Sequence, residues 1–98
     1  MEVALTERAM RSYRALTERP MSGAIVTDAT DLVQILNEFH AYGPLALDGL
    51  FESRKLQKVK SPKGEDVYAL ELNELSAILM ISRDKLIVMD VVHGVEPR

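Results

Sequence analysis

The stretch VYALELNELSAILMISRDKLIVMDVV, residues 67–92, decides the fold of this chain. Apolar residues gather in three segments of it, and the links between the segments, Asn73-Glu74 and Arg83-Asp84-Lys85, are only two or three residues long. This pattern predicts strands at residues 66–72, 76–82 and 85–92. Links this short permit only antiparallel pairing, because a parallel crossover needs about a dozen residues or more. The stretch therefore predicts a three-stranded antiparallel meander.

The last two strands of this meander are unusually apolar. Ala77–Ile81 contains only apolar residues, and Leu86–Val92 is nearly as apolar. Runs of this kind are typical of central strands that are covered on both faces. We therefore expect the side chains of Ile78, Leu79 and Ile87 to be shielded from water.

The beginning of the sequence predicts a strand and then a helix. Val3 and Leu5 show the alternation of a short strand. Thr6 suits the N-cap of a helix, where its hydroxyl accepts a hydrogen bond from a backbone N–H of the first turn. A helix at Thr6–Glu18 then presents one apolar stripe to a core, and Pro20 ends it. The stripe consists of Ala9, Met10, Tyr13 and Leu16.

A second helix is predicted after a loop. Met21–Thr30 is rich in small and polar residues and is interpreted as the loop. Asp31 suits the N-cap, and Gln34, three residues later, completes a capping box. The helix extends to Ala41, because Tyr42-Gly43-Pro44 contains a glycine suited to the left-handed position and a proline that cannot continue the helix. Its apolar face consists of Leu32, Ile35, Leu36 and Phe39.

The middle of the chain adds smaller elements. Residues 45–53 allow a short helical turn, Leu56–Val59 predicts a short strand, and Ser61–Gly64 has the composition of a turn. Two amphipathic helices need an apolar sheet face to cover. The sequence therefore predicts a single α+β domain over residues 1–98. It has one N-terminal strand, two helices packed on an antiparallel sheet, and a C-terminal three-strand meander.

Composition indicates a cytoplasmic globular protein. The chain has 98 residues, 47% of them hydrophobic and 28% charged, which argues against disorder. It contains no cysteine, which excludes disulfides, thiolate zinc sites and a cysteine nucleophile. The first residues lack the features of a signal peptide, and no apolar run approaches the ~20 residues that span a bilayer. We therefore expect no association with membranes.

Positive charge is concentrated in one segment, although the net charge is −3. Five basic residues and no acid lie between Arg54 and Lys63. Such a segment favours contact with an acidic partner. Lysines also protect edge strands from aggregation, so a purely structural role stays open. The basic residues are Arg54, Lys55, Lys58, Lys60 and Lys63.

His93 is the candidate for acid–base chemistry, because histidine titrates near neutral pH. Asp90 precedes it by three residues, and residues three apart on a regular strand point to opposite faces. Asp90 would therefore orient His93 only at a bulge or at the end of a strand, and the alternative is a structural or exposed histidine. His40 is explained by the favourable position of a cation at a helix C-terminus. Metal-ligand spacing, a phosphate-binding loop and a serine-nucleophile motif are missing from the sequence, so no metal or other cofactor is predicted.

Three parts of the sequence carry a resemblance to a known family. They are EVALTERA at residues 2–9, LQKVK at 56–60 with VYALEL at 67–72, and LIVMDVVHG at 86–94. The first looks like a strand and the Thr or Ser that starts a helix in the RelE/ParE superfamily of small bacterial toxins. The second resembles that family's lysine-leucine pair and the strand with tyrosine that follows it. The third is similar to the final strand, which in the gyrase-poisoning branch often closes on histidine and glycine.

The resemblance implies a RelE-like fold and the toxin of a bacterial type II toxin–antitoxin system, neutralised by a cognate antitoxin. The RelE branch inhibits translation by cutting messenger RNA at the ribosome, and the ParE branch poisons DNA gyrase. RNA cleavage of this kind is metal-independent attack of a ribose 2′-hydroxyl on the adjacent phosphate. It needs a base, an acid, and cations that stabilise the phosphate as charge develops on it.

The sequence departs from the nuclease branch at its basic positions. Ala69 and Glu71 stand where that branch has alternating basic residues, and Ser76-Ala77 begins the strand that usually has an arginine. A carboxylate at Glu71 repels a phosphate dianion. The usual catalytic residues of an endoribonuclease are thus replaced.

Two functional hypotheses follow. In the first, the chain is a toxin that acts on RNA or on gyrase. If it cleaves RNA, His93 is the expected catalytic residue, and the expected RNA- or partner-binding residues are Arg54, Lys55, Lys58, Lys60 and Arg98. In the second, it is a non-catalytic module of the same fold that binds other proteins.

Overall fold

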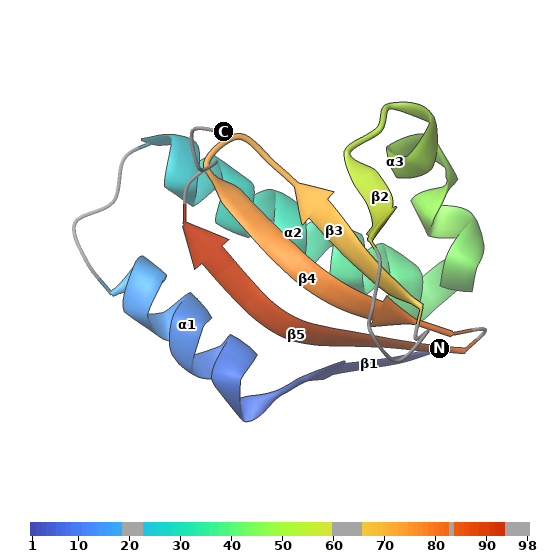
Figure 1. Ribbon diagram of the computed structural model, residues 1–98, viewed down its shortest axis with the longest axis horizontal. Coiled ribbons are helices and arrows are strands. Elements are labelled where there is room, and N and C mark those ends of the chain that lie inside the picture. The colour runs from blue at the N-terminus through green and yellow to red at the C-terminus, as the bar shows by residue number, and fades with distance from the viewer. Residues whose placement is uncertain (19–22, 60–65, 83, 94–98) are drawn as a thin grey trace.

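The structure is a computed structural model that describes residues 1–18, 23–59, 66–82 and 84–93 (Figure 1). Its elements, in chain order, are β1 (Glu2–Leu5), α1 (Glu7–Thr17), α2 (Gly23–Tyr42), the 3₁₀ helix η1 (Gly43–Leu47), α3 (Asp48–Glu52), β2 (Leu56–Val59), β3 (Val67–Glu71), β4 (Leu75–Ile81) and β5 (Lys85–His93).

The strands form one sheet in the order β1-β5-β4-β3-β2. β2 to β5 pair antiparallel, and β1 pairs parallel with β5. This arrangement confirms the predicted α+β architecture with its N-terminal strand, two helices and C-terminal meander. The parallel pairing of β1 is a feature that the sequence pattern did not predict.

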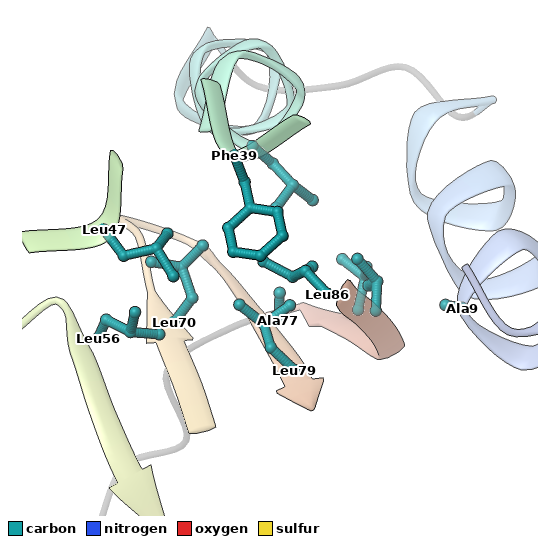
Figure 2. Packing of buried hydrophobic residues seen from close by; sticks show 11 residues of the cluster. Ala9, Phe39, Leu47, Leu56, Leu70, Ala77, Leu79 and Leu86 are labelled. Carbon is teal, nitrogen blue, oxygen red and sulfur yellow. The ribbon is translucent and has the colours of Figure 1, made fainter. Parts of the chain in front are cut away.

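The two long helices cover the same face of the sheet. In Figure 1, α2 crosses behind the sheet and α1 lies beside β5. Figure 2 shows Phe39 pointing from α2 toward Ala77 and Leu86 of the two central strands. Burying these side chains is the main source of stability for the domain, at about 25 cal/mol per Å² of apolar surface. The buried cluster consists of Ala9, Leu32, Phe39, Leu47, Leu56, Leu70, Ala77, Leu79, Leu86, Val88 and Val91.

The predicted loop at Met21–Thr30 is wrong from Gly23 onward, because α2 already begins there. Two hydroxyls in this stretch bond within the helix: Thr27 donates to the carbonyl oxygen of Gly23, and Thr30 donates to that of Val26, each at 3.0 Å. Threonines that return their hydroxyls to the preceding turn are compatible with a helix. The polar composition therefore reflected a helix with internally bonded side chains.

The predicted N-cap at Asp31 is also wrong, because α2 begins before this residue. Asp31 lies inside α2, and the side-chain amide of Gln34 donates instead to the Glu38 carboxylate at 3.2 Å. The predicted end of this helix is confirmed within one residue, since α2 ends at Tyr42 and Gly43 has a φ of 72°. At that angle a residue with a Cβ atom is strained.

The smaller elements follow the prediction where the structure describes them. The helical turn expected within residues 45–53 is present as η1 and α3. The strand expected at Leu56–Val59 is β2, an edge strand of the sheet. The turn predicted at Ser61–Gly64 lies outside the described residues.

A buried carboxylate joins α2 to the sheet. Asp28 is fully buried, and its two oxygens accept hydrogen bonds from the backbone N–H groups of Glu74 and Leu75 and from the side-chain amide of Asn73. All three donors lie in or beside the turn between β3 and β4. An ionised carboxylate that accepts several hydrogen bonds is a strong link, because charge-assisted bonds are roughly twice as strong as neutral ones.

The same contacts set the pKa of Asp28. Burial on its own raises this pKa, but the hydrogen bonds from Glu74, Leu75 and Asn73 together outweigh burial and leave the pKa below its ordinary value. A carboxyl group whose pKa is depressed by folding stabilises the folded state above its unfolded pKa. That stabilisation is lost as the pH falls through the folded pKa.

Replacing Asp28 by alanine is expected to lower the free energy of unfolding by about 2–5 kcal/mol at neutral pH. The reason is that three donors lose their shared acceptor, of which the N–H of Leu75 is buried and the other two are partly buried. Urea denaturation followed by circular dichroism measures this loss. Asp31→Asn on the same helix is the control and should change stability by no more than about 0.5 kcal/mol.

The stability difference between wild type and Asp28→Asn should shrink as the pH is lowered from 7 toward 3, because protonation removes the charged form in the wild type. A difference that stays constant over this range would contradict the role of the ionised carboxylate.

Candidate functional site

The face of the sheet opposite α2, here called the open face, is the candidate site. Side chains alternate between faces along a strand, and cross-strand partners share a face. Leu70, Ala77 and Leu86 belong to the helix-covered core. The residues directly before and after each of them on the same strand therefore lie on the open face. In the part of the chain that the structure describes, both long helices contact the other side (Figure 1).

This arrangement corrects the expectation that the central strands are covered on both faces. Leu79 is fully buried, as expected, but Ile78 and Ile87 are only partly buried. The apolar runs therefore supply two surfaces, a core beneath α2 and an apolar surface on the open face.

One row of the open face is aliphatic across all five strands. The strand registers place Ala4 beside Ile87, Ile87 beside Met80, Met80 beside Val67 and Val67 beside Val59. We call this line of residues the transverse row. Its members are partly buried, except for Val59, which is exposed. The open face becomes more polar away from this row, where Ile78 lies beside Asp90 and Ser76 beside Glu71.

A β-bulge shapes the middle of the open face. Ile78 is opposite Asp90, whereas the next residue of β4, Leu79, is opposite Val88. Met89 is therefore the extra residue on β5. A bulge of this kind bends its strand and turns a neighbouring side chain to a new direction.

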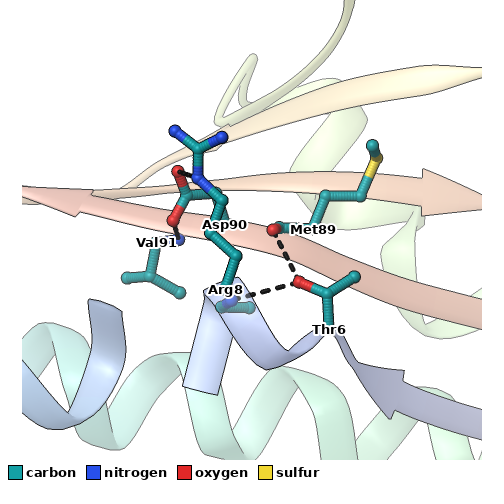
Figure 3. Close-up of polar contacts among 6 residues, drawn as sticks. Thr6, Arg8, Met89, Asp90 and Val91 are labelled. Carbon is teal, nitrogen blue, oxygen red and sulfur yellow. Dashed lines mark hydrogen bonds and ion pairs between the residues drawn. The ribbon is translucent and has the colours of Figure 1, made fainter. Parts of the chain in front are cut away.

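Thr6 holds the start of α1 against this bulge (Figure 3). Its hydroxyl accepts from the backbone N–H of Ala9 at 3.0 Å, which confirms the predicted N-cap. The same hydroxyl donates to the carbonyl oxygen of Met89 at 2.8 Å, and the backbone N–H of Thr6 donates to that of Val88 at 3.0 Å. One side chain thus caps the helix and bonds a carbonyl group at the irregular part of β5.

Arg8 and Asp90 form an ion pair beside this junction. The Nε atom of Arg8 lies 3.2 Å from one Asp90 oxygen, and the other Asp90 oxygen accepts from the backbone N–H of Val91 at 2.9 Å. The Arg8 side chain is 81% exposed and that of Asp90 only 17%. In Figure 3 the terminal nitrogens of the guanidinium group point away from the strand.

The ion pair borders a shallow hollow of about 400 Å³. Ile78 and Met89 supply its apolar lining, and Thr6, Arg8 and Asp90 supply its polar side. Sites that bind organic ligands or partner side chains commonly combine an apolar lining with a few polar groups of this kind.

His93 lies at the end of β5 and faces away from Asp90. It is paired with Leu75, a core residue, whereas Asp90 is paired with Ile78 of the open face. Its Nε2 atom lies 3.7 Å from a Glu74 oxygen, and both side chains are about half exposed. The bulge precedes Asp90 and leaves His93 on the opposite face, so Asp90 does not orient it.

The predicted basic residues that the structure describes lie at the other edge of the sheet. Arg54 and Lys55 precede β2, and Lys58 is within it. The Nζ atom of Lys58 lies 3.0 Å from an Asp66 oxygen, and the hydrogen bond and charge of Asp66 raise the pKa of this lysine. Lys60 and Arg98 lie outside the described residues.

Sheet geometry separates the two halves of the predicted catalytic site. β5 and β2 are three strand spacings apart, about 14 Å, because neighbouring strands are ~4.8 Å apart. Lys58 is opposite Tyr68, and Tyr68 is opposite Leu79 of β4. Leu79 is four residues along β4 from Leu75, which is opposite His93. That offset is about 13 Å along the strands, at right angles to the ~14 Å across them. The Cα atoms of His93 and Lys58 are therefore roughly 19 Å apart. The structure therefore does not bring His93 and Lys58 together.

Two further findings concern metals and membranes. Within residues 1–18, 23–59, 66–82 and 84–93, three or more His, Asp or Glu side chains do not gather anywhere in a way that could hold a metal ion. Over the same ranges, every helix is too short or too polar to cross a membrane.

Sequence reasoning missed Asp28 and the open face. Asp28 precedes Leu32, Ile35 and Phe39 by four, seven and eleven residues, so it occupies the buried stripe of a helix. This spacing was an available signal of a buried carboxylate. The open face depends on strand registers, which pair residues far apart in the sequence.

Comparisons with known proteins place the fold. No protein-family model and no curated protein matches the sequence. A chain of the toxin–antitoxin complex RelBE2 from Mycobacterium tuberculosis matches the structure with a TM-score of 0.54 and 18% identity, covering 94% of this chain and 95% of that chain.

Two other solved structures agree with this match. The YoeB dimer from Staphylococcus aureus gives a TM-score of 0.60 at 10% identity, covering 99% of this chain and 98% of that chain. A copper-bound mutant toxin from Helicobacter pylori gives 0.60 at 13% identity, with coverage of 95% and 93%. These likenesses confirm the RelE-like fold.

Thr6→Val should lower the free energy of unfolding by about 1–2 kcal/mol, because it removes a helix cap and the bond to Met89 while keeping the branched shape. Arg8→Ala should cost less than about 1 kcal/mol, since its ion pair is largely exposed on the arginine side. Chemical denaturation of both variants measures the contrast. Equal losses would contradict the assignment of Thr6 as the junction residue.

Proposed function

We propose that this chain is the toxin of a toxin–antitoxin pair, neutralised by a cognate antitoxin, and that it acts by binding a protein target instead of cutting RNA. The first part is supported by the RelE-like fold over nearly the whole chain. The solved structures that share the fold include a toxin–antitoxin complex and a protein described as a toxin.

The observation that carries the second part is the separation of the candidate catalytic groups. Cleavage by a 2′-hydroxyl needs an acid, a base and cations around one phosphate. His93 faces Glu74 at one end of the sheet, whereas Lys58 is bound to Asp66 roughly 19 Å away. Ala69 on the open face is uncharged. This distribution disfavours a nuclease site built from these residues.

DNA gyrase is the favoured target of the two that the resemblance implies. Poisoning of gyrase depends on contact with a protein and needs no group that stabilises a developing phosphate charge. The segment LIVMDVVHG, which carries the resemblance to the gyrase-poisoning branch, forms β5 up to His93. Messenger RNA cleavage at the ribosome, the other activity that the resemblance implies, is the alternative.

The basic edge of the sheet suits an acidic part of the antitoxin. Arg54, Lys55 and Lys58 are all exposed, and the side chain of Lys58 remains 62% exposed despite its ion pair. Long-range attraction between exposed charges increases association rates and weakens as salt screens it.

Induced expression of the chain in bacteria is expected to arrest growth, and His93→Ala should arrest growth to the same extent. Protein synthesis, RNA integrity and plasmid supercoiling are followed after induction. We expect altered supercoiling or cleaved DNA before any fall in protein synthesis, with intact messenger RNA. Co-expression of the antitoxin should restore growth.

Two outcomes would count against this proposal. Normal growth at a verified level of folded protein would refute the toxin assignment and favour the non-catalytic module. Messenger RNA cleavage that falls about 10²–10⁴-fold in His93→Ala would instead show that the histidine is a catalytic acid or base.

A further inference from the structure

The outward side of α2 carries no charged residue, although it faces solvent. Its exposed positions recur every three or four residues, which places them on one stripe of the helix. Within α2, which the structure describes from end to end, Asp28 lies in the core, and Asp31 and Glu38 lie on the flank toward α3. A helix that faces only water usually carries charged residues on that side. The stripe, here called the outer stripe, consists of Gly23, Val26, Thr27, Thr30, Val33, Gln34, Asn37 and Ala41.

The threonines of this surface are less polar than the sequence indicates. Thr27 and Thr30 donate their hydroxyls to carbonyl oxygens four residues earlier, each at 3.0 Å, and Thr17 of α1 does the same at 2.9 Å. A hydroxyl that is bonded inside its own helix needs no acceptor from another molecule. Covering the outer stripe therefore leaves none of these donors without a partner, and the methyl groups remain available for packing.

A groove of about 360 Å³ between α1 and α2 runs beside the outer stripe. Val26 and Val33 on its α2 wall are nearly half exposed, and Met10 of α1 is exposed as well. When two helices pack, the side-chain ridges of one enter the grooves of the other. The same face of this molecule thus offers both a ridge and a groove. The groove is lined by Tyr13 and Thr17 of α1 and by Val26, Ala29, Thr30 and Val33 of α2.

The two borders of this face carry opposite charges. On the α1 side, the side chains of Arg11 and Arg14 are 74% and 72% exposed. On the α3 side lie the carboxylates of Asp31 and Glu38. Each arginine pairs with a glutamate one turn away on α1, and exposed pairs of this kind are weak. The arginines can therefore exchange these partners for carboxylates of another molecule.

This distribution of shape and charge suits a second copy of the chain. A twofold axis that runs parallel to α2, between the outer stripe and the groove, places the stripe of each copy in the groove of the other. The same rotation sets the basic border of each copy against the acidic border of the other. Arg14 and Asp31 then lie at the same height, because Tyr13 and Thr17 are level with the segment Val26–Val33 in the groove. An unrelated partner would require only one of these features.

The size of the face is that of a small specific interface. α2 has 20 residues and α1 has 11. At 1.5 Å per residue and about 11 Å of width, the two helices together present roughly 500 Å² in flat projection. Interdigitating side chains have more accessible surface than their projection, and small specific interfaces bury about 600 Å² on each partner. We therefore expect reversible association with a dissociation constant of about 1–100 µM.

We propose that the protein forms a twofold dimer through the outward sides of α1 and α2. The outer stripe of each copy packs in the groove of the other, and Arg14 pairs with Asp31 of the second copy. The four helices lie in the middle and the two sheets lie outside, so the open faces point away from each other. This inference does not depend on the proposed function.

Thr30→Lys tests the dimer at the centre of the outer stripe. Thr30 is exposed in the monomer and lysine favours helices, so the fold is kept, whereas each dimer would bury two unpaired cations. Sedimentation of the purified protein from about 1 µM to 1 mM gives the dissociation constant, which should rise at least about 100-fold. Val59→Lys is the matched control, because it adds the same charge at a β-branched residue on the opposite side of the sheet, and its constant should equal that of the wild type.

A charge exchange tests the predicted pairing and the relative position of the two copies. Arg14→Glu and Asp31→Arg should each raise the dissociation constant about three- to tenfold, because like charges then face each other across the interface. The double variant restores opposite charges and should return to within about twofold of the wild type. Circular dichroism and urea midpoints close to those of the wild type show that each variant is folded.

Each contrary result overturns the dimer. A wild type that stays monomeric at about 1 mM overturns it outright. A dimer that Thr30→Lys weakens no more than Val59→Lys lies on another surface. A monomeric wild type whose binding to the antitoxin is lost in Thr30→Lys would show that this face takes a different protein. Because none of these measurements uses growth arrest, their results stand whether or not the toxin assignment holds.

Discussion

The arrangement of helices on the sheet depends on the buried carboxylate of Asp28. It lies on the same stripe of α2 as Phe39, three helical turns and about 16 Å away. By accepting hydrogen bonds from the turn between β3 and β4, Asp28 fixes one end of α2 over one end of the sheet. Phe39 then reaches the core near the other end of the helix (Figure 2). A charged group buried in this way specifies one position of the helix, because any sliding would leave the charge without its donors.

This position of α2 determines which side of the sheet is available to a partner. With α2 fixed by Asp28 and α1 fixed by Thr6 at the bulge of β5, both helices occupy one face. The bulge at Met89 precedes Asp90, which pairs with Arg8, and the regular alternation that follows leaves His93 on the other face. His93 instead lies 3.7 Å from a Glu74 oxygen. The position of the helices thus accounts for the uncovered open face, and strand alternation accounts for the separation of Asp90 from His93.

The amino-acid sequence alone predicted the parts of the fold that depend on local patterns. Alternation and short links indicated the meander, Thr6 marked the start of α1, and Gly43 marked the end of α2. The beginning of α2 was not predicted, because Asp28 and its neighbours have the composition of a loop, and the donors that bury Asp28 lie more than forty residues later in the chain. His93 was correctly placed at the end of a strand, but its separation from Lys58 follows from strand order, which local patterns do not encode.

The central claim is that Asp28 and Thr6 fix both long helices on one face of the sheet and leave the open face accessible to solvent. Paramagnetic attenuation of methyl resonances by a water-soluble nitroxide measures this directly. In the free protein, the methyl signals of Ile78, Met80 and Ile87 should be attenuated much more than those of the buried Leu79 and Val88. Protection of these three signals to the level of Leu79 and Val88 would contradict the account.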